Sequence, residues 1–250
     1  MTPMVALLLL LSQPAAERDQ ALVLLQEANR LYQDGDFAGA IRSYRSSLEL
    51  GYESAALHYN LGNAYFKTRQ IGPCILCYER AKRLAPGDTD IAHNLQMAQL
   101  YIVDKIEVPP PFFLFKWWSD MKKWLGIDLL GLFALVTYNL FMVLIFFRLL
   151  VKKQRIRTLL RVVHIPATIL FVFASIFFTL RLHEEKNLIE GVVIVDRVDV
   201  KSSPADDGEE VFALHEGIKV RITESSGEYV RILLADGKVG WLHMEAVERI

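Results

Sequence analysis

The sequence predicts a multidomain membrane protein with an all-α repeat module, a two-helix transmembrane hairpin and a small all-β barrel. Three observations predict it. Residues 21–88 repeat with a period of 34 residues, two long apolar runs lie between residues 129 and 180, and short alternating strands follow residue 189. Of the 250 residues, 52% are hydrophobic, and much of that excess lies in the two runs. This concentration indicates membrane segments rather than an unusually apolar core.

The charge and motif content narrow the function classes. A net charge of −1 gives no bulk attraction to nucleic acid, so we expect no nucleic-acid partner. The sequence shows no phosphate-binding glycine loop, nucleophile elbow or set of metal ligands at the usual spacing. We therefore expect no enzymatic activity, no cofactor and no metal.

The first residues have the pattern of a secretory signal peptide. A short apolar segment, Val5–Leu11, is followed by Ser12 to Ala16, where small residues suit cleavage. The alternative is an apolar start of the first helix. We expect a signal peptide over residues 1–16.

The repeats occupy residues 21–54 and 55–88, within a module spanning residues 17–106. Paired positions agree in type: Asn29 with Asn63, Ile41 with Ile75, and Tyr44 with Tyr78. Small residues stand where paired helices would touch. These positions resemble the tetratricopeptide repeat, and residues 89–105 would form a capping helix after the second repeat.

The resemblance implies an all-α tetratricopeptide superhelix with a concave groove that binds peptides or partner segments. In that family the groove residues come from the first helix of each repeat. The candidates in this chain are Asn29, Asn63 and Lys67, with Asn94 on the capping helix. Each could equally be a solvated polar position.

Cys74 and Cys77 form a C-x-x-C pattern at the start of a predicted helix. Thiols near a helix N-terminus can have a lowered pKa, so a periplasmic thiol-redox role for Cys74 and Cys77 is one hypothesis. The alternative is a structural pair, since Cys74 stands where the repeat requires a small buried residue. No second pair of metal ligands is near in sequence.

Residues 107–126 read as a linker. Three prolines, Pro109 to Pro111, end the helical module, and an aromatic segment with interspersed lysines follows. Aromatic and lysine side chains in this position are typical of a helix lying at the headgroup level of a bilayer. A ligand-binding aromatic box is the alternative.

Two transmembrane helices are expected over residues 127–148 and 162–182, each containing nineteen consecutive residues without Asp, Glu, Lys or Arg. The loop between them, residues 149–161, is basic and lacks acidic residues, so it should be cytoplasmic and both soluble modules extracytoplasmic. Four residues should help the helices to pack closely: Thr137, Asn139, Ala174 and Ser175.

Residues 188–250 predict a small barrel, because turn signals such as Asp207-Gly208 and Asp236-Gly237 separate short alternating strands. The run from Asp236 to Leu242 resembles the bacterial SH3-like family. That resemblance implies a core role for Trp241 and a module that binds cell-wall peptides or proteins. Trp241 and Tyr229 are the structural or binding candidates, and recognition of proline-rich ligands is not expected.

The order of the segments is similar to that of the BatE proteins of bacterial aerotolerance operons. This resemblance implies a bacterial inner-membrane protein with periplasmic modules, working beside von Willebrand A-type membrane proteins and a MoxR-type ATPase. The predicted function is a membrane-anchored adaptor in which two weak binding modules act together. The alternatives are a thiol-redox protein, a protein that binds peptidoglycan peptides, and a sensor or transporter subunit.

Overall fold

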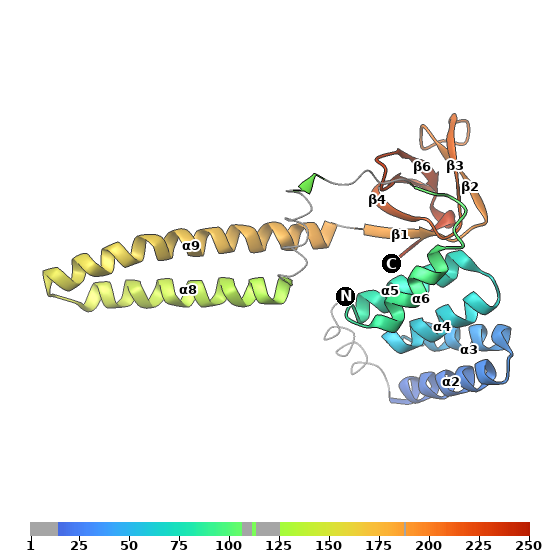
Figure 1. The fold of residues 1–250 in the computed structure, drawn as a ribbon, viewed down its shortest axis with the longest axis horizontal. Helices are drawn as coiled ribbons and strands as arrows, with labels where there is room; N and C mark the ends of the chain where they lie inside the picture. Colours follow the sequence, from blue (N-terminus) through green and yellow to red (C-terminus); the bar gives the residue numbers. More distant parts are fainter. Residues whose placement is uncertain (1–14, 107–111, 114–125, 188) are drawn as a thin grey trace. The chain divides into compact units, whose positions relative to one another are not determined.

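The computed structural model describes residues 15–106, 112–113, 126–187 and 189–250 (Figure 1). The chain divides into two compact units. One combines residues up to Val108 with Ile189–Ile250, and the other spans Pro109–Leu188. The predicted signal peptide and nearly all of the predicted linker, residues 107–126, lie outside the described residues.

The first unit begins with five helices, which we call the repeat module. They are α2 (Ala15–Gln33), α3 (Phe37–Glu49), α4 (Ala55–Lys67), α5 (Ile71–Leu84) and α6 (Thr89–Gln99). Side-chain caps start three of them. For example, Asp36 accepts a hydrogen bond from the Gly39 amide at 2.8 Å, and Ser54 accepts one from the Leu57 amide at 3.1 Å. Short loops therefore fold the helices into antiparallel pairs, as the period predicts.

The helices of a pair approach closely because small residues stand at their contacts. Ala28, Ala40 and Ala64 are fully buried in one core with Tyr44 and the other large apolar residues of the module. A Cβ added at Gly62 would lie 2.7 Å from the Tyr78 ring, so glycine is required there. The repeat pattern therefore reflects helix packing.

The predicted capping helix ends earlier than expected, at Gln99 rather than at residue 105. After one further turn, the chain leaves α6 and runs toward the strands. Ile102 and Ile106 pack against the core of the sheet, and the Asp104 carboxylate accepts a hydrogen bond from the His215 amide at 2.7 Å. Burial against the strands thus takes over from helix continuation.

Seven antiparallel strands complete the first unit as the sheet module. They are β1 (Ile189–Val193), β2 (Arg197–Lys201), β3 (Glu210–His215), β4 (Lys219–Ser226), β5 (Tyr229–Leu233), β6 (Val239–His243) and β7 (Val247–Arg249), with a 3₁₀ turn, η1 (Met244–Ala246), before the last. Their order is β3-β2-β6-β5-β4-β1-β7. The predicted barrel is not closed, because β3 and β7 stand at opposite edges and each pairs with one neighbour.

Trp241 does not occupy the core position expected for it. On β6 the buried residues are Gly240 and Leu242, and Trp241 lies half-buried on the opposite face. A Cβ at Gly240 would come within 2.4 Å of Val200 Cγ1, so the inward position beside β2 accepts no side chain. Strand alternation then turns the indole outward.

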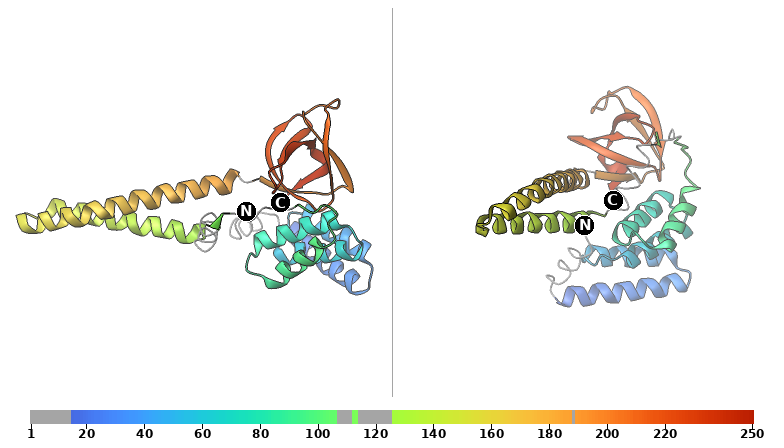
Figure 2. Two further views of the ribbon diagram at one scale, coloured as in Figure 1. Left: turned by 45° about the horizontal axis from the view of Figure 1, so that its top comes forward. Right: turned by 60° about the vertical axis from the view of Figure 1, so that its left-hand side comes forward.

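The sheet module packs along one face of α5. At its start, the Gly72 amide donates to the Glu216 carboxylate at 2.7 Å. Near its middle, Lys219 Nζ lies 3.1 Å from Glu79 Oε2 and 2.8 Å from Glu190 Oε2. Val192 of β1 is fully buried in the same core as the helices. The two modules therefore form one compact unit (Figures 1 and 2), and we call this contact the α5 junction.

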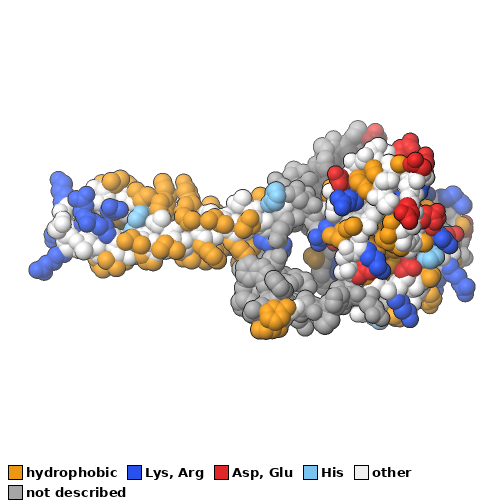
Figure 3. All heavy atoms as spheres, turned by 90° about the horizontal axis from the view of Figure 1, so that it is seen from above, with side chains coloured by type: hydrophobic (Ala, Val, Ile, Leu, Met, Phe, Trp, Pro, Cys, Tyr) orange, Lys and Arg blue, Asp and Glu red, His pale blue; other side chains and the backbone are white. Residues whose placement is uncertain are grey.

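The second unit contains two antiparallel helices, α8 (Ile127–Leu150) and α9 (Gln154–Asn187). Both are long and apolar enough to cross a membrane, over Leu129–Leu150 and Gln154–His183. The predicted loop 149–161 is shorter than expected, because most of its basic residues lie on the first turns of α9. Figure 3 shows basic side chains gathered at that end of the hairpin, beyond a belt of hydrophobic ones.

Three of the four residues expected at the helix contact lie there or close to it. Thr137 and Ala174 are buried between the helices, and Ser175 is half-buried. Asn139 differs, since its side chain is exposed on α8. The position of Asn139 on the helix explains this, because two residues after Thr137 the helix surface has turned by about 200°.

Two glycine substitutions test the α5 junction. Gly217 and Gly237 have φ near +90°, but a Cβ at Gly217 would lie 2.9 Å from Ile75 Cδ1, whereas Gly237 faces open space. We expect Gly237→Ala to lower the free energy of unfolding by about 1 kcal/mol, and Gly217→Ala by roughly 1–3 kcal/mol more. Denaturant unfolding of the full chain in detergent measures both. Equal losses would contradict the junction.

Candidate partner-binding groove

The first site in the repeat module is a hydrogen-bonded set of three side chains from three helices. Asn29 on α2 accepts at its carbonyl oxygen from the Tyr44 hydroxyl of α3 at 2.6 Å. The same oxygen accepts from the Asn60 amide of α4 at 3.1 Å. One oxygen therefore ties together both helices of the first repeat and the first helix of the next.

The same arrangement recurs 34 residues further along the chain. Asn63 accepts from the Tyr78 hydroxyl at 2.7 Å and from the Asn94 amide at 3.0 Å. Asn94 also donates to the Tyr59 hydroxyl at 2.9 Å. We call the sets Asn29–Tyr44–Asn60 and Asn63–Tyr78–Asn94 the first and second rungs. The repeat therefore extends from the packing residues to the polar network.

Burial fixes the chemistry of the rungs. Tyr44 and Tyr78 are almost completely buried, and this burial raises the pKa of Tyr44 to about 12 and that of Tyr78 further. Both phenols therefore remain protonated donors at neutral pH. Because Asn29 and Asn63 accept with their carbonyl oxygens, the NH₂ groups of these two residues stay outside the network. Each rung thus offers uncharged donors to a ligand.

A cavity of about 340 Å³ opens at the first rung, lined by Asn29, Tyr32, Gln33, Tyr44 and Asn60. Of the predicted groove residues, Asn29 lines this cavity, and Asn63 and Asn94 meet in the second rung. Lys67 is the exposed last residue of α4 and belongs to neither. Asn60 was missed at the sequence level, although it precedes Asn94 by one period of 34 residues.

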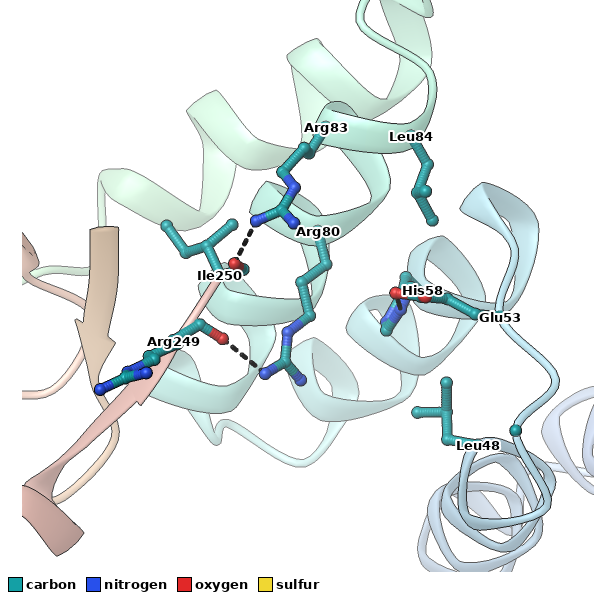
Figure 4. Close-up of a pocket in the computed structure, with 9 residues that line it drawn as sticks. Leu48, Glu53, His58, Arg80, Arg83, Leu84, Arg249 and Ile250 are labelled. Atoms are coloured by element: carbon teal, nitrogen blue, oxygen red, sulfur yellow. Dashed lines mark hydrogen bonds and ion pairs between the residues drawn. The ribbon is translucent and has the colours of Figure 1, made fainter. Parts of the chain in front are cut away.

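A second cavity, of about 370 Å³, lies beside the α5 junction (Figure 4). Arg80 donates to the Glu248 carboxylate and to the Arg249 carbonyl, and Arg83 donates to the Ile250 carbonyl. His58 is 2% exposed, its Nε2 lies 3.3 Å from Glu53, and burial lowers its pKa. The two arginines of α5 hold the end of the last strand, which gives this cavity a structural explanation.

The two cysteines lie inside the repeat core rather than at a surface. Both are free and buried. Burial raises the pKa of Cys74 to about 12 and also raises the pKa of Cys77. Thiol-redox chemistry needs an accessible thiolate, so this environment disfavours the redox hypothesis. In the described part of the chain, no group of three His, Cys, Asp or Glu side chains comes together as metal ligands.

The two candidates in the sheet module share one face. Tyr229 on β5 pairs in register with His243, and Arg231 pairs with Trp241, so both aromatic side chains lie on the outward face. The Tyr229 hydroxyl donates to Asp206, and Lys201 Nζ lies 5.8 Å from the centre of the Tyr229 ring. The structure brings Tyr229 and Trp241 onto adjacent strands, away from the buried face.

Alkylation tests the state of the thiols. At pH 8 a thiol with a pKa near 12 is ionised in roughly one molecule in ten thousand, so native Cys74 and Cys77 should not react with iodoacetamide. Both should react in denaturant. Ser202→Cys provides an exposed control cysteine that should react fully in the native protein. Mass spectrometry measures each site, and native labelling of Cys74 at the control rate would support the redox hypothesis.

Two family models match the repeat module. Residues 28–68 match the model described as TPR repeat, and residues 55–88 match the model described as tetratricopeptide repeat. No curated protein matches the chain. The matches cover both rungs apart from Asn94, and they confirm that this part of the chain is built of tetratricopeptide repeats.

Proposed function

We propose that the protein is a membrane-anchored adaptor, rather than an enzyme, that binds a protein partner in the groove of its tetratricopeptide repeats. The two matching rungs beside an open cavity carry this proposal. Tetratricopeptide repeats imply protein partners in general, and the rungs supply hydrogen-bonding groups at equivalent positions of successive repeats.

The chemistry of the groove indicates what kind of segment it accepts. The five residues lining the first-rung cavity are amides and tyrosines, and none carries a charge at neutral pH. Amide groups match the donors and acceptors of a peptide backbone. We therefore expect an extended polar segment, bound with weak dependence on salt concentration, rather than a strongly acidic one.

The hairpin provides the membrane anchor in this proposal. The apolar helices span 22 and 30 residues, or about 33 and 45 Å at 1.5 Å per residue, against about 30 Å for the hydrocarbon core. Most of their large apolar side chains are exposed in the isolated hairpin. Exposed apolar surface on this scale is typical of lipid contact.

The α5 junction supports the same topology. The chain enters the hairpin from the repeat module and returns from it into the sheet module, and both modules belong to one unit. Both must then lie on the same side of a bilayer, which requires an even number of crossings. The basic residues at the hairpin turn place that turn in the cytoplasm and the modules outside it.

The sheet module supplies a second candidate binding surface. Its short antiparallel strands and glycine turns are similar to the bacterial SH3-like family, although the sheet is open. The order of modules resembles that of BatE proteins, so von Willebrand A-type membrane proteins, with a MoxR-type ATPase system, are the first partners to test. The inner membrane and the periplasm of a bacterium are the proposed location.

Site-specific photo-crosslinking in cells tests the groove. A benzoylphenylalanine at Gln33 or Lys67 should form a covalent adduct with a partner protein, whereas one at Arg42, which is exposed on α3, should not. Mass spectrometry identifies the adduct. Equal adducts at all three positions would indicate non-specific contact.

Removing the rung amides should weaken the partner. The double variant Asn60→Ala/Asn94→Ala loses at least one hydrogen-bonding group in each rung, so we expect the adduct yield at Gln33 to fall roughly tenfold. Gln96→Ala removes an exposed amide of α6 that is outside the rungs and should leave the yield unchanged. Matching thermal midpoints show that each variant is folded. An unchanged yield for the double variant would place the partner elsewhere.

Cysteine labelling of intact cells tests the topology. Arg42→Cys in the repeat module and Ser202→Cys in the sheet module should both react with a membrane-impermeant maleimide. Lys153→Cys at the hairpin turn should react after permeabilisation. The unlabelled parent chain is the background control, because its cysteines are buried. Labelling of one module without the other would contradict a shared side.

A further inference from the structure

The hairpin places one side-chain amide on its outward surface. Asn139 lies at the centre of α8, and its side chain is exposed. Its amide donates to the Leu135 carbonyl at 2.8 Å. This bond uses one of the two amide hydrogens, and the carbonyl oxygen of Asn139 accepts no hydrogen bond from the described residues.

Other polar side chains of the hairpin are satisfied within their own helices. The hydroxyl groups of Thr137, Thr168 and Thr179 each donate to a carbonyl one turn earlier, at 2.8 to 3.0 Å. A hydroxyl that makes such a bond has no further hydrogen to donate. Asn139 therefore differs from these residues, because it presents both a donor and an acceptor to its surroundings.

Asn139 stands on a line of exposed large residues. Leu132 and Phe146 lie seven residues before and after it, and Val136 and Val143 complete a spacing of four and three. All four are exposed apolar residues. This spacing forms a straight seam on a helix that pairs with another at a small crossing angle. The seam lies away from the face that carries the buried Leu130 and Thr137.

This inference depends on the proposed membrane insertion of α8. In hydrocarbon, water is absent and an unpaired amide group is costly, so the amide requires a polar partner from another helix. Every copy of the chain inserts in the same direction, which makes the α8 helices of two copies parallel. A two-fold axis along the membrane normal then brings each residue of the seam opposite its own copy at the same depth.

We propose that α8 pairs with α8 of a second copy of this chain through reciprocal hydrogen bonds between the two Asn139 amides. A primary amide is its own complement, since each carbonyl oxygen accepts from the other NH₂ group. A central asparagine also fixes the register of two helices, because any shift would leave both amides in contact with apolar side chains. A homodimer with the Leu132, Asn139 and Phe146 seam at its axis follows.

Two measurements on the full chain in liposomes test the dimer. Single-molecule photobleaching counts subunits as the protein-to-lipid ratio is varied. Asn139→Leu should weaken association roughly tenfold, the scale of the two lost interhelical hydrogen bonds. Asn139→Gln should retain association. Thr179→Val removes an exposed but internally bonded hydroxyl of α9 and should have no effect.

Disulfide crosslinking with adjacent positions tests the seam. Phe146 and Phe147 are both exposed, but they are separated by about 100° around the helix. Phe146→Cys should form a covalent dimer under oxidation, and Phe147→Cys should not. The parent chain measures any background from Cys74 and Cys77.

The outcomes separate this proposal from the proposed function. Dimers that survive Asn139→Leu, equal crosslinking at positions 146 and 147, or a monomer at every protein density would overturn the Asn139 pair. A different protein crosslinked at Phe146→Cys in cells would replace the second copy as the occupant. Extraction of the wild-type protein from membranes by alkaline carbonate would instead overturn the membrane anchor, and with it both proposals.

Discussion

Coverage of the outer face of α5 by the strands is the contact on which the rest of the molecule depends. In a repeat array each helix pair contacts its neighbours, so an end of the array needs a cover. The α6 helix covers one side of α5, and the sheet module covers another through Val192, Lys219 and the turn at Gly217. The contact joins residues more than a hundred positions apart in sequence and thereby makes the inserted hairpin a loop of one folded unit.

The same demand for paired polar groups governs both halves of the chain. In the repeats, the carbonyl oxygens of Asn29 and Asn63 each take two donors, and buried tyrosines supply one donor each time. This arrangement holds three helices together without burying a charge, which would cost more free energy. The hairpin applies the rule less completely, because its threonines are satisfied internally while Asn139 retains an unused acceptor.

Sequence periodicity was sufficient to predict the helices and three of the four polar groove residues, because each repeat presents the same local pattern. Asn60 could have been predicted by applying the period backwards from Asn94. The α5 junction could not, because nothing near Gly72 or Glu216 in the sequence indicates that they meet. Trp241 was assigned to the core from its residue type, but the close approach of Val200 to Gly240 decides which face of β6 is buried. The length of α9 was underestimated because its basic first turns have the composition of a loop.

The α5 junction changes how the two binding surfaces can act together. Modules on independent tethers gain affinity over a range of distances, whereas modules fixed to one another favour a partner of one matching geometry. Deleting the sheet module would also expose Ile75 and leave Glu79 without Lys219, so a resulting loss of binding would report damage to the groove as well as loss of a second surface. Point changes on the outward face of β5 and β6, at Tyr229 or Trp241, separate the two effects, because these side chains lie outside the core that joins the modules. Cooperation between the surfaces, if it operates, is therefore a property of a rigid unit held at the membrane.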